Sequence, residues 1–121
     1  MFPNAAMLES LVNDLSKEDA VIVVEGKRDT DALTRLGIRR DRIIQAAQRS
    51  CRDLEARIAG DYTKLIPLFD NDRSGRKRLA LFSAYFSSSG MWIDYSYTRR
   101  MRSAGLYCVE DADNVLFHAG R

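Results

Sequence analysis

The chain contains few of the residues that hold small secreted or zinc-binding domains together. Its 121 residues include two cysteines, one histidine and two prolines. Cys51 and Cys108 lie far apart and form no C-x-x-C pair, so a zinc site has little support. A single histidine also excludes a multi-histidine metal centre. Two inert thiols in a reducing compartment fit this usage, with a disulfide between them as the alternative.

Long apolar runs are also missing. No run approaches the ~20 residues that a membrane-spanning helix needs. The stretch from Met1 to Leu15 carries Glu9 and Asp14 but no basic residue, unlike the start of a signal peptide. We therefore expect a cytoplasmic protein without membrane contact. Hydrophobic residues still make up 45% of the sequence, enough for the core of a single domain over residues 1–121.

Charge of one sign is concentrated in parts of the chain, although the net charge is only +2. Residues 73–102 contain seven basic side chains and one acid, Asp94, whereas residues 1–19 contain four acids and one base, Lys17. A basic stretch of this kind indicates a polyanionic partner such as RNA or DNA. A solvated helix face is the alternative reading of the charge alone.

Helical and strand patterns alternate along the chain. Apolar spacing predicts helices over 4–16, 29–36, 52–58, 74–87, 97–103 and 111–117. Short apolar runs predict strands over 20–24, 42–46, 65–69 and 91–93, with a further short strand over 106–109. This order predicts an α/β fold with a central, parallel, four-stranded sheet flanked by helices.

Four residues mark where the predicted elements begin, end or bend. Asn4 is placed to cap the first helix, and Gly37 and Gly60 are placed to end the second and third. Pro67 falls inside the strand over 65–69. Because proline cannot donate a ladder hydrogen bond, that position must be unpaired or near a bulge.

Acidic residues stand at the ends of the two strongest strands. Glu25 closes the first strand, and Asp70 and Asp72 follow the strand over 65–69. In an open α/β sheet, ligands bind beyond the carboxyl ends of the strands. If the two strands are neighbours, three carboxylates meet there and repel one another unless a cation lies between them. Oxygen ligands of this kind suit Mg²⁺ or Mn²⁺.

Glycine and basic residues follow these acids. Gly75 stands where a new helix begins, which allows a tight turn and close approach of a phosphate to backbone N–H groups. Lys27, Arg28, Arg76 and Lys77 can neutralise phosphate charge, although Lys27 and Arg28 also fit a merely solvated helix start. Asp29 either caps its helix or joins the acidic set.

Taken together, two motifs resemble the Toprim domain, the fold shared by topoisomerases, primases and several nucleases. They read Val23-Val24-Glu25-Gly26-Lys27-Arg28-Asp29 and Phe69-Asp70-Asn71-Asp72-Arg73-Ser74-Gly75-Arg76. The likeness covers residues 20–113. It is greatest to the small stand-alone group, which includes the ribonuclease that matures 5S ribosomal RNA and short archaeal proteins. Asp94, Arg99-Arg100-Met101 and Val109-Glu110-Asp111 resemble the C-terminal pattern of the archaeal proteins.

This resemblance implies a Rossmann-like Toprim fold and a Mg²⁺-dependent nuclease acting on RNA or DNA. Glu25 would be the general acid or base, and Asp70 and Asp72 would hold Mg²⁺, with Glu25 counted among the candidate ligands. The nucleic-acid backbone would be bound by basic residues: Lys27, Arg28, Arg76, Lys77, Arg99 and Arg100.

Other interpretations remain open at this point. The chain shows neither the tyrosine domain of a topoisomerase nor the zinc-binding region of a primase, so it could act as a non-catalytic binding module. It could also be a subunit that docks through its acidic first helix, with a protein partner or in a homo-oligomer. Arg99 and Arg100 could form salt bridges to Asp94 or Glu110. Glu110 and Asp111 could join the acidic site or cap the last helix.

Overall fold

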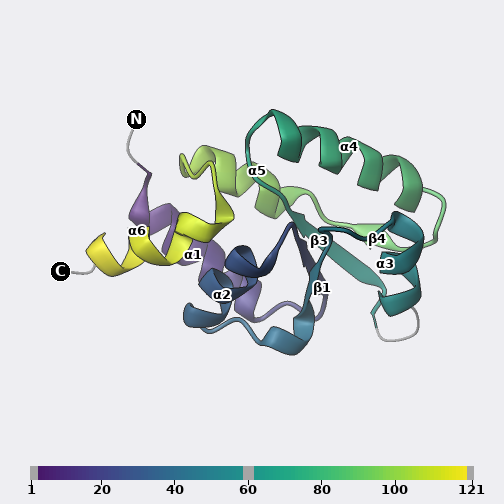
Figure 1. The fold of residues 1–121 in the computed structure, drawn as a ribbon. Helices are drawn as coiled ribbons and strands as arrows, with labels where there is room; N and C mark the ends of the chain where they lie inside the picture. The colour runs from purple at the N-terminus through teal and green to yellow at the C-terminus, as the bar shows by residue number, and fades with distance from the viewer. Residues whose placement is uncertain (1–2, 59–61, 120–121) are drawn as a thin grey trace.

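The computed structural model describes residues 3–58 and 62–119 and confirms the alternation of helices and strands (Figure 1). Gly60, the predicted end of the third helix, lies outside the described residues. In chain order the elements are α1 (Ala5–Ser16), β1 (Val21–Val24), α2 (Lys27–Arg35), β2 (Ile43–Gln45), α3 (Cys51–Ile58), β3 (Lys64–Leu68), α4 (Arg73–Phe86), β4 (Trp92–Ile93), α5 (Ser96–Ser103) and α6 (Ala112–Ala119), with 3₁₀ turns at Arg40–Arg42 and Val109–Asp111.

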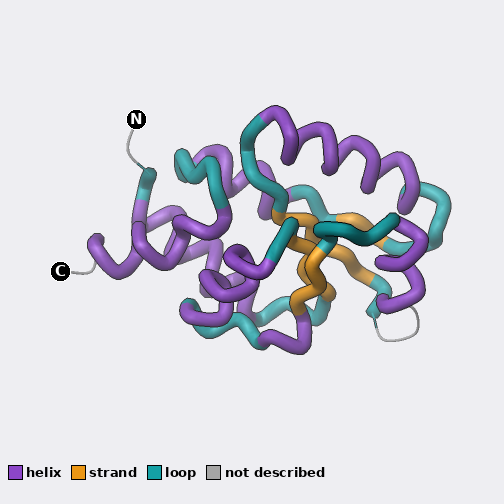
Figure 2. Tube along the Cα trace, in the orientation of Figure 1, coloured by secondary structure: helices purple, strands orange, loops and turns teal. Residues whose placement is uncertain are grey.

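The four strands form one sheet in the order β2-β1-β3-β4, and every neighbouring pair is parallel. In the register of the central pair, Val24 lies opposite Leu68. The strands occupy the middle of the molecule, with helices around them (Figure 2). The predicted fold class, an α/β fold with a central parallel four-stranded sheet, is confirmed and is consistent with a Rossmann-like fold.

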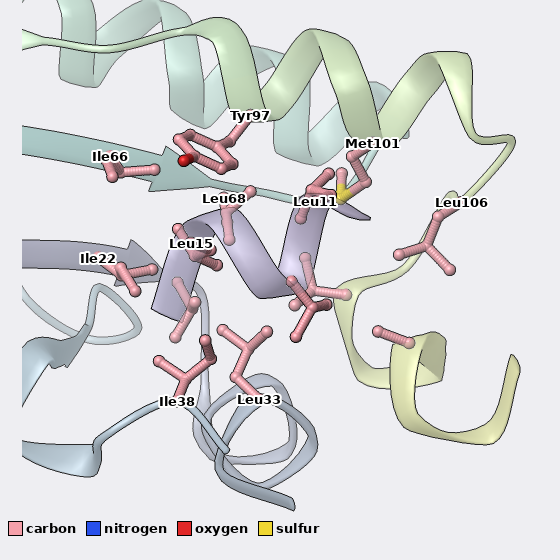
Figure 3. Close-up of a cluster of buried hydrophobic side chains, with 14 of the residues drawn as sticks. Leu11, Leu15, Ile22, Leu33, Ile38, Ile66, Leu68, Tyr97, Met101 and Leu106 are labelled. Atoms are coloured by element: carbon pink, nitrogen blue, oxygen red, sulfur yellow. The ribbon is translucent and has the colours of Figure 1, made fainter. Parts of the chain in front are cut away.

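The first face of the sheet carries the larger part of the core. Ile22 and Val24 of β1 and Ile66 and Leu68 of β3 point to this face. They pack with buried side chains from α1, α2, α5 and the segment before α6: Leu8, Leu11, Leu15, Leu33, Tyr97, Met101 and Leu106. Figure 3 shows the α1 leucines enclosed between the side chains of α5 and those of Leu33 and Ile38.

The second face is covered by α3 and α4. Val21 and Val23 of β1 alternate with the residues of the first face and pack on this side, as strand geometry requires. Leu54, Ile58, Phe82 and Phe86 of the two helices, together with Phe69, complete this layer. None of the helices within residues 3–58 and 62–119 is long and apolar enough to cross a membrane.

The predicted helix ends are found where the capping residues stand. Asn4 accepts the backbone N–H of Met7 at 3.1 Å and so caps α1. Gly37 has φ +97°, and the next N–H, that of Ile38, donates to the carbonyl of Leu33. This is the left-handed helix end that glycine favours. The start of α2 is earlier than predicted, at Lys27, because Gly26 takes the extended N-cap conformation.

Pro67 lies within β3 without costing the sheet a hydrogen bond. Thr63 and Leu65 direct their carbonyls toward β4, to the N–H groups of Trp92 and Asp94. Pro67 faces the same side, but β4 pairs only with Lys64 and Leu65 and does not reach it. The Pro67 carbonyl instead accepts the hydroxyl of Thr98 in α5 at 2.8 Å. Pro67 is paired with Val23 in the register of β1 and β3, so the expectation of an unpaired position is confirmed only on the side toward β4.

The prediction of a strand over 106–109 is wrong. Residues 106–108 are irregular, and a 3₁₀ turn begins at Val109. Leu106 and Val109 are buried, so their apolar character reflects packing against the core rather than strand pairing. The backbone is held by loop contacts, including the 2.6 Å hydrogen bond from the N–H of Asn71 to the carbonyl of Tyr107.

Candidate functional site

The candidate site lies where the direction of the strand order reverses. From β1 the chain moves outward to β2, then crosses back to β3 on the other side of β1. The helices that follow the two central strands diverge, because α2 packs on the first face and α4 on the second. In open α/β sheets, the region beyond the carboxyl ends of the strands at such a reversal is the usual ligand site. Glu25 directly follows β1, and Asp70 follows β3.

The loop after β3 is fixed in place by backbone contacts. Asp72 caps α4, and its Oδ1 accepts the N–H of Gly75 at 2.7 Å. Asp70 Oδ1 accepts the N–H of Val109 at 3.0 Å. A Cβ added to Gly75 would stand 1.9 Å from the Asp70 carbonyl oxygen. Glycine is therefore required at 75 by the contact between α4 and the backbone of Asp70, whereas the close approach of a phosphate stays a prediction.

The loop after β1 is more open. The N–H of Gly26 donates to Asp29 Oδ2 at 3.0 Å, while a Cβ added to Gly26 would meet nothing within 4 Å. Glu25 Oε1 is buried and has no hydrogen-bond partner among the described residues. Its ion-pair partner, the Arg78 Nε, is 3.9 Å away. The negative charge of this buried carboxylate oxygen is thus only partly compensated.

Burial and mutual repulsion perturb the acids at this end of the sheet. Burial raises the pKa of Glu25, and the charge of Asp70 adds to the effect while Arg78 opposes it. Burial also raises the pKa of Asp70; the hydrogen bond from Val109 opposes the rise, and the charges of Asp72 and neighbouring acids add to it. We call Glu25, Asp29, Asp70 and Asp72 the carboxyl edge.

Asp29 is a member of the carboxyl edge that sequence reasoning left undecided. Its side chain caps the start of α2, yet the residue is only 6% exposed. Burial first, and then the charges of Asp70 and Glu110, raise its pKa to about 6. The signal in the sequence was its position four residues after Glu25, in the first turn of the following helix. Glu110 itself lies near enough to act on this carboxyl, as does the adjacent Asp111 on Asp70.

Arg78 is a side chain at the candidate site that the sequence analysis did not single out. It reaches from α4 to Glu25 and also points Nη1 at the Ala46 carbonyl, 3.5 Å away. Helical spacing could have identified it, because Arg78 follows Gly75 by three residues and precedes Phe82 by four. Both of those residues are buried, so Arg78 belongs to the inner face of α4 rather than its solvent face.

Most of the predicted nucleic-acid-binding residues are exposed near the carboxyl edge. Lys27 and Arg28 begin α2, and Arg76 and Lys77 lie in the first turns of α4. The two pairs therefore lie at the starts of two helices that pack on opposite faces of the sheet. Arg99 is exposed on α5.

Arg100 is held elsewhere. Its guanidinium pairs with Asp14 of α1 at 2.9 Å and stands over the ring of Tyr97. Arg100 thus forms a salt bridge that ties α5 to α1, in place of the pairing with Asp94 or Glu110 that the sequence left open as an alternative. Asp94 instead pairs with Lys64 at 3.2 Å. The structure does not bring Arg100 to the carboxyl edge.

The carboxyl edge suits a hydrated Mg²⁺ better than a closed metal cage. Among the described residues, no three His, Cys, Asp or Glu side chains stand together as a ready set of metal ligands. Mg²⁺ keeps several waters and is usually bound by one or two carboxylates with substrate phosphates. The unpartnered Glu25 Oε1 and the purely carboxylate donor set of Asp70 and Asp72 fit that kind of binding.

Comparison with known proteins finds relatives along most of the chain. The chain is 31% identical to a UPF0292 protein of Methanosarcina acetivorans, over 91% of this chain and 76% of that protein. It is 29% identical to the UPF0292 protein of Pyrococcus abyssi over 93% of this chain and 81% of the relative. To a UPF0292 protein of Thermococcus onnurineus it is 35% identical, over 80% and 71% of the two chains. No family model matches the chain.

A solved structure shares the fold. The structure described as a putative protein from Aquifex aeolicus superposes with a TM-score of 0.81 at 27% identity. The match covers 86% of this chain and 96% of that one.

Proposed function

The chain belongs to the UPF0292 family, and we propose that it is a Mg²⁺-dependent Toprim nuclease that cleaves RNA or DNA. The observation that carries the proposal is the carboxyl edge, where Glu25 and Asp70 end neighbouring strands and Glu25 Oε1 has no hydrogen-bond partner among the described residues. Like charges in one partly buried place are costly to the fold, and a divalent cation would offset that cost.

Asp70 and Asp72 would hold the ion. Each uses Oδ1 for a backbone N–H, so Oδ2 of each carboxylate is available for an ion. The backbone packing of Gly75 on Asp70 pre-positions these oxygens, as a precise site requires. Bound there, Mg²⁺ would neutralise charge on the transferring phosphoryl group and orient the nucleophile.

Glu25 would move the proton. Its carboxyl has a raised pKa, caused first by burial, which brings it closer to the range in which an acid or base works at neutral pH. As base it would take the proton of the attacking water, and as acid it would protonate the leaving oxygen. The open space at Gly26 leaves room for the substrate beside it.

The exposed basic residues at the starts of α2 and α4 would hold the nucleic-acid backbone. Lys27 and Arg28 would contact phosphates from the α2 side, and Arg76 and Lys77 from the α4 side. Because binding of this kind releases counterions, affinity should fall steeply with added salt.

The test is cleavage of a panel of structured and single-stranded RNAs and DNAs in Mg²⁺, Mn²⁺ or EDTA. We expect metal-dependent cleavage by the parent protein, loss of cleavage in Asp70→Asn, and weakened Mn²⁺ binding in the same variant by calorimetry. Asp41→Asn is the matched control, since Asp41 is exposed and pairs with Arg39 away from the carboxyl edge. Equal Mn²⁺ affinity in Asp70→Asn and the parent would overturn the proposed metal site.

A non-catalytic nucleic-acid-binding module is the second candidate. The observation that favours it is the absence, among the described residues, of three side chains already arranged as metal ligands. Salt-sensitive binding of nucleic acid without cleavage of any panel member, in any of the metals, would favour this module over the enzyme.

A further inference from the structure

We infer that the pocket between α3 and α4 receives one unstacked nucleobase of the nucleic acid bound at the carboxyl edge. The inference rests on the proposed function and names the part of the substrate that the protein reads. It makes single-stranded, looped or frayed nucleic acid the substrate class, because a paired base inside a duplex cannot enter a protein pocket without leaving its stack.

The pocket has the size and floor for a flat apolar ring. Its volume is about 320 Å³, at the lower end of the roughly 300–1,000 Å³ of small-molecule sites. Leu54, Phe69 and Phe82 form its floor, and all three are buried. Leu81, which is 64% exposed, stands at its mouth. Every base has an apolar face, so such a floor accepts bases with little regard to sequence.

The rim of the same pocket is basic. Arg49, Lys77 and Arg78 line it, together with the hydroxyl residues Ser50 and Ser74. An apolar floor under a cationic rim is complementary to an aromatic ring that carries phosphate, whereas a purely apolar peptide side chain would leave the rim charges unused. A larger groove of about 690 Å³ beside α1 is lined by Glu9 and has no basic side chain in its lining. The basic side chains in the lining therefore distinguish the pocket between α3 and α4 from the groove beside α1.

Arg78 connects the pocket to the carboxyl edge. Its guanidinium lies in the pocket wall, 3.9 Å from Glu25 Oε1 and 3.5 Å from the carbonyl of Ala46. A phosphate at the carboxyl edge and a base in the pocket would thus lie on the two sides of one side chain. That separation suits adjacent parts of one nucleotide or of two consecutive nucleotides.

The pocket can be tested without any metal. In EDTA, ¹³C-methyl spectra of the protein are recorded during titration with each nucleoside 5′-monophosphate and, separately, with ribose 5-phosphate. We expect the nucleotides to shift the methyl signals of Leu54 and Leu81, and ribose 5-phosphate to leave them in place. Methyl shifts of equal size with ribose 5-phosphate, or none with any nucleotide at saturating concentration, would overturn the inference.

A blocking variant gives the second measurement. Ser74→Phe places a ring at the pocket mouth, and Ala80→Phe adds the same ring at an exposed α4 position outside the pocket lining. We expect Ser74→Phe to weaken nucleotide binding at least about tenfold and Ala80→Phe to leave it within twofold, in line with the value of one stacked base. If apolar peptides shift the Leu54 methyls and nucleotides do not, the pocket is a peptide site and the inference fails.

The experiments can reject the inference about the pocket and the proposed function independently of each other. Nucleotides that fill the pocket of a protein that neither binds Mn²⁺ at Asp70 nor cleaves nucleic acid would remove the function and keep the pocket. Metal-dependent cleavage that is unchanged by Ser74→Phe, and by an abasic site at every position near the cut, would keep the function and remove the pocket.

Discussion

At the start of β3, acidic side chains are paired with cations, whereas at its end they accumulate. Glu18 accepts a hydrogen bond from Lys64 Nζ at 2.7 Å and another from the Tyr97 hydroxyl at 2.6 Å. Lys64 also pairs with Asp94. We call Glu18, Lys64, Asp94 and Tyr97 the amino-end cluster. The hydrogen bond from Lys64, and then that from Tyr97, lower the pKa of Glu18.

The carboxyl edge shows the opposite trend. The pKa values of Glu25, Asp29 and Asp70 are all raised, with burial the largest cause in each. The same sheet thus holds acids that stabilise the fold at one end and acids that cost it stability at the other. Carboxylates kept at such a cost are typical of functional sites. The contrast supports assigning stability to the amino-end cluster and chemistry to the carboxyl edge.

The largest expected effect is a difference in cleavage activity between variants of the carboxyl edge and variants of the amino-end cluster. Glu25→Gln should lower kcat for cleavage by about 100-fold or more, because the proton transfer of the proposed mechanism is lost. Glu18→Gln should change kcat by less than about twofold, since the amino-end cluster does not touch the substrate in that mechanism. Rates are compared at a temperature where both variants are folded, as judged by circular dichroism. Equal losses in both variants would erase the contrast.

The second largest effect concerns the backbone packing that holds the loop after β3 in place. Gly75→Ala should lower the free energy of unfolding by about 3 kcal/mol, because its Cβ would collide with the backbone of Asp70. Gly26→Ala should cost less than about 1 kcal/mol, since nothing lies within 4 Å of that Cβ. Urea unfolding can be followed through Trp92, the single tryptophan, whose ring lies against Lys64. Similar midpoints for the two alanine variants would mean that the loop after β3 adapts.

The pH dependence of stability should have opposite slopes at the two ends. The pKa of Asp29 is raised from 3.8 to about 6, so its favourable contribution is present below pH 3.8 and is lost as the pH rises through about 6. Asp29→Asn keeps an oxygen for the Gly26 N–H and should gain up to about 2 kcal/mol at pH 7.

Glu18 provides the matched case. Its pKa is lowered, so its contribution is present above its ordinary value of 4.5 and is lost as the pH falls. Glu18→Gln should lose about 1 kcal/mol at pH 7 and little at pH 3. Urea unfolding of both variants between pH 3 and 8 measures the two slopes. Slopes of the same sign would contradict the contrast between the ends.

The smallest expected effect distinguishes two roles of Asp72, as the N-cap of α4 and as a ligand of the ion. Asp72→Ala should cost about 1 kcal/mol, because α4 loses its N-cap, whereas Asp72→Asn should keep the cap and cost less than about 0.5 kcal/mol. Both variants should bind Mn²⁺ more weakly than the parent protein. Urea unfolding and calorimetry measure the two properties independently. Unchanged Mn²⁺ affinity in both would leave Asp72 as a helix cap alone.

Local patterns in the sequence predicted most of the fold. The strand ending at Glu25, the cap at Asn4 and the helix end at Gly37 follow from side-chain spacing and backbone preference at neighbouring positions. The pattern at Leu106 and Val109 reported burial correctly but could not show that no strand lies beside it. The spacing of apolar residues predicts that a residue is buried, but it does not predict which element covers that residue.

For the candidate site, too, the sequence predicted the positions of single residues better than their contacts. The sequence placed Glu25 and Asp70 at strand ends, and the pairing of β1 with β3 in the structure shows that these strands are neighbours, which the sequence had left as a condition. The reach of Arg78 to Glu25 and the pairing of Arg100 with Asp14 depend on contacts between distant elements. Charge in the sequence shows which residues need partners, whereas the tertiary fold determines which partners they meet.

Pro67 also limits association through one part of the sheet edge, the carboxyl half of β3. Because β4 is short, the carboxyl half of β3 would otherwise present an open edge on which a strand of another molecule could add. Pro67 offers no N–H there, and Thr98 already occupies its carbonyl. Pairing with a strand of another molecule is therefore hindered along the carboxyl half of β3, next to the loop that carries Asp70 and Asp72.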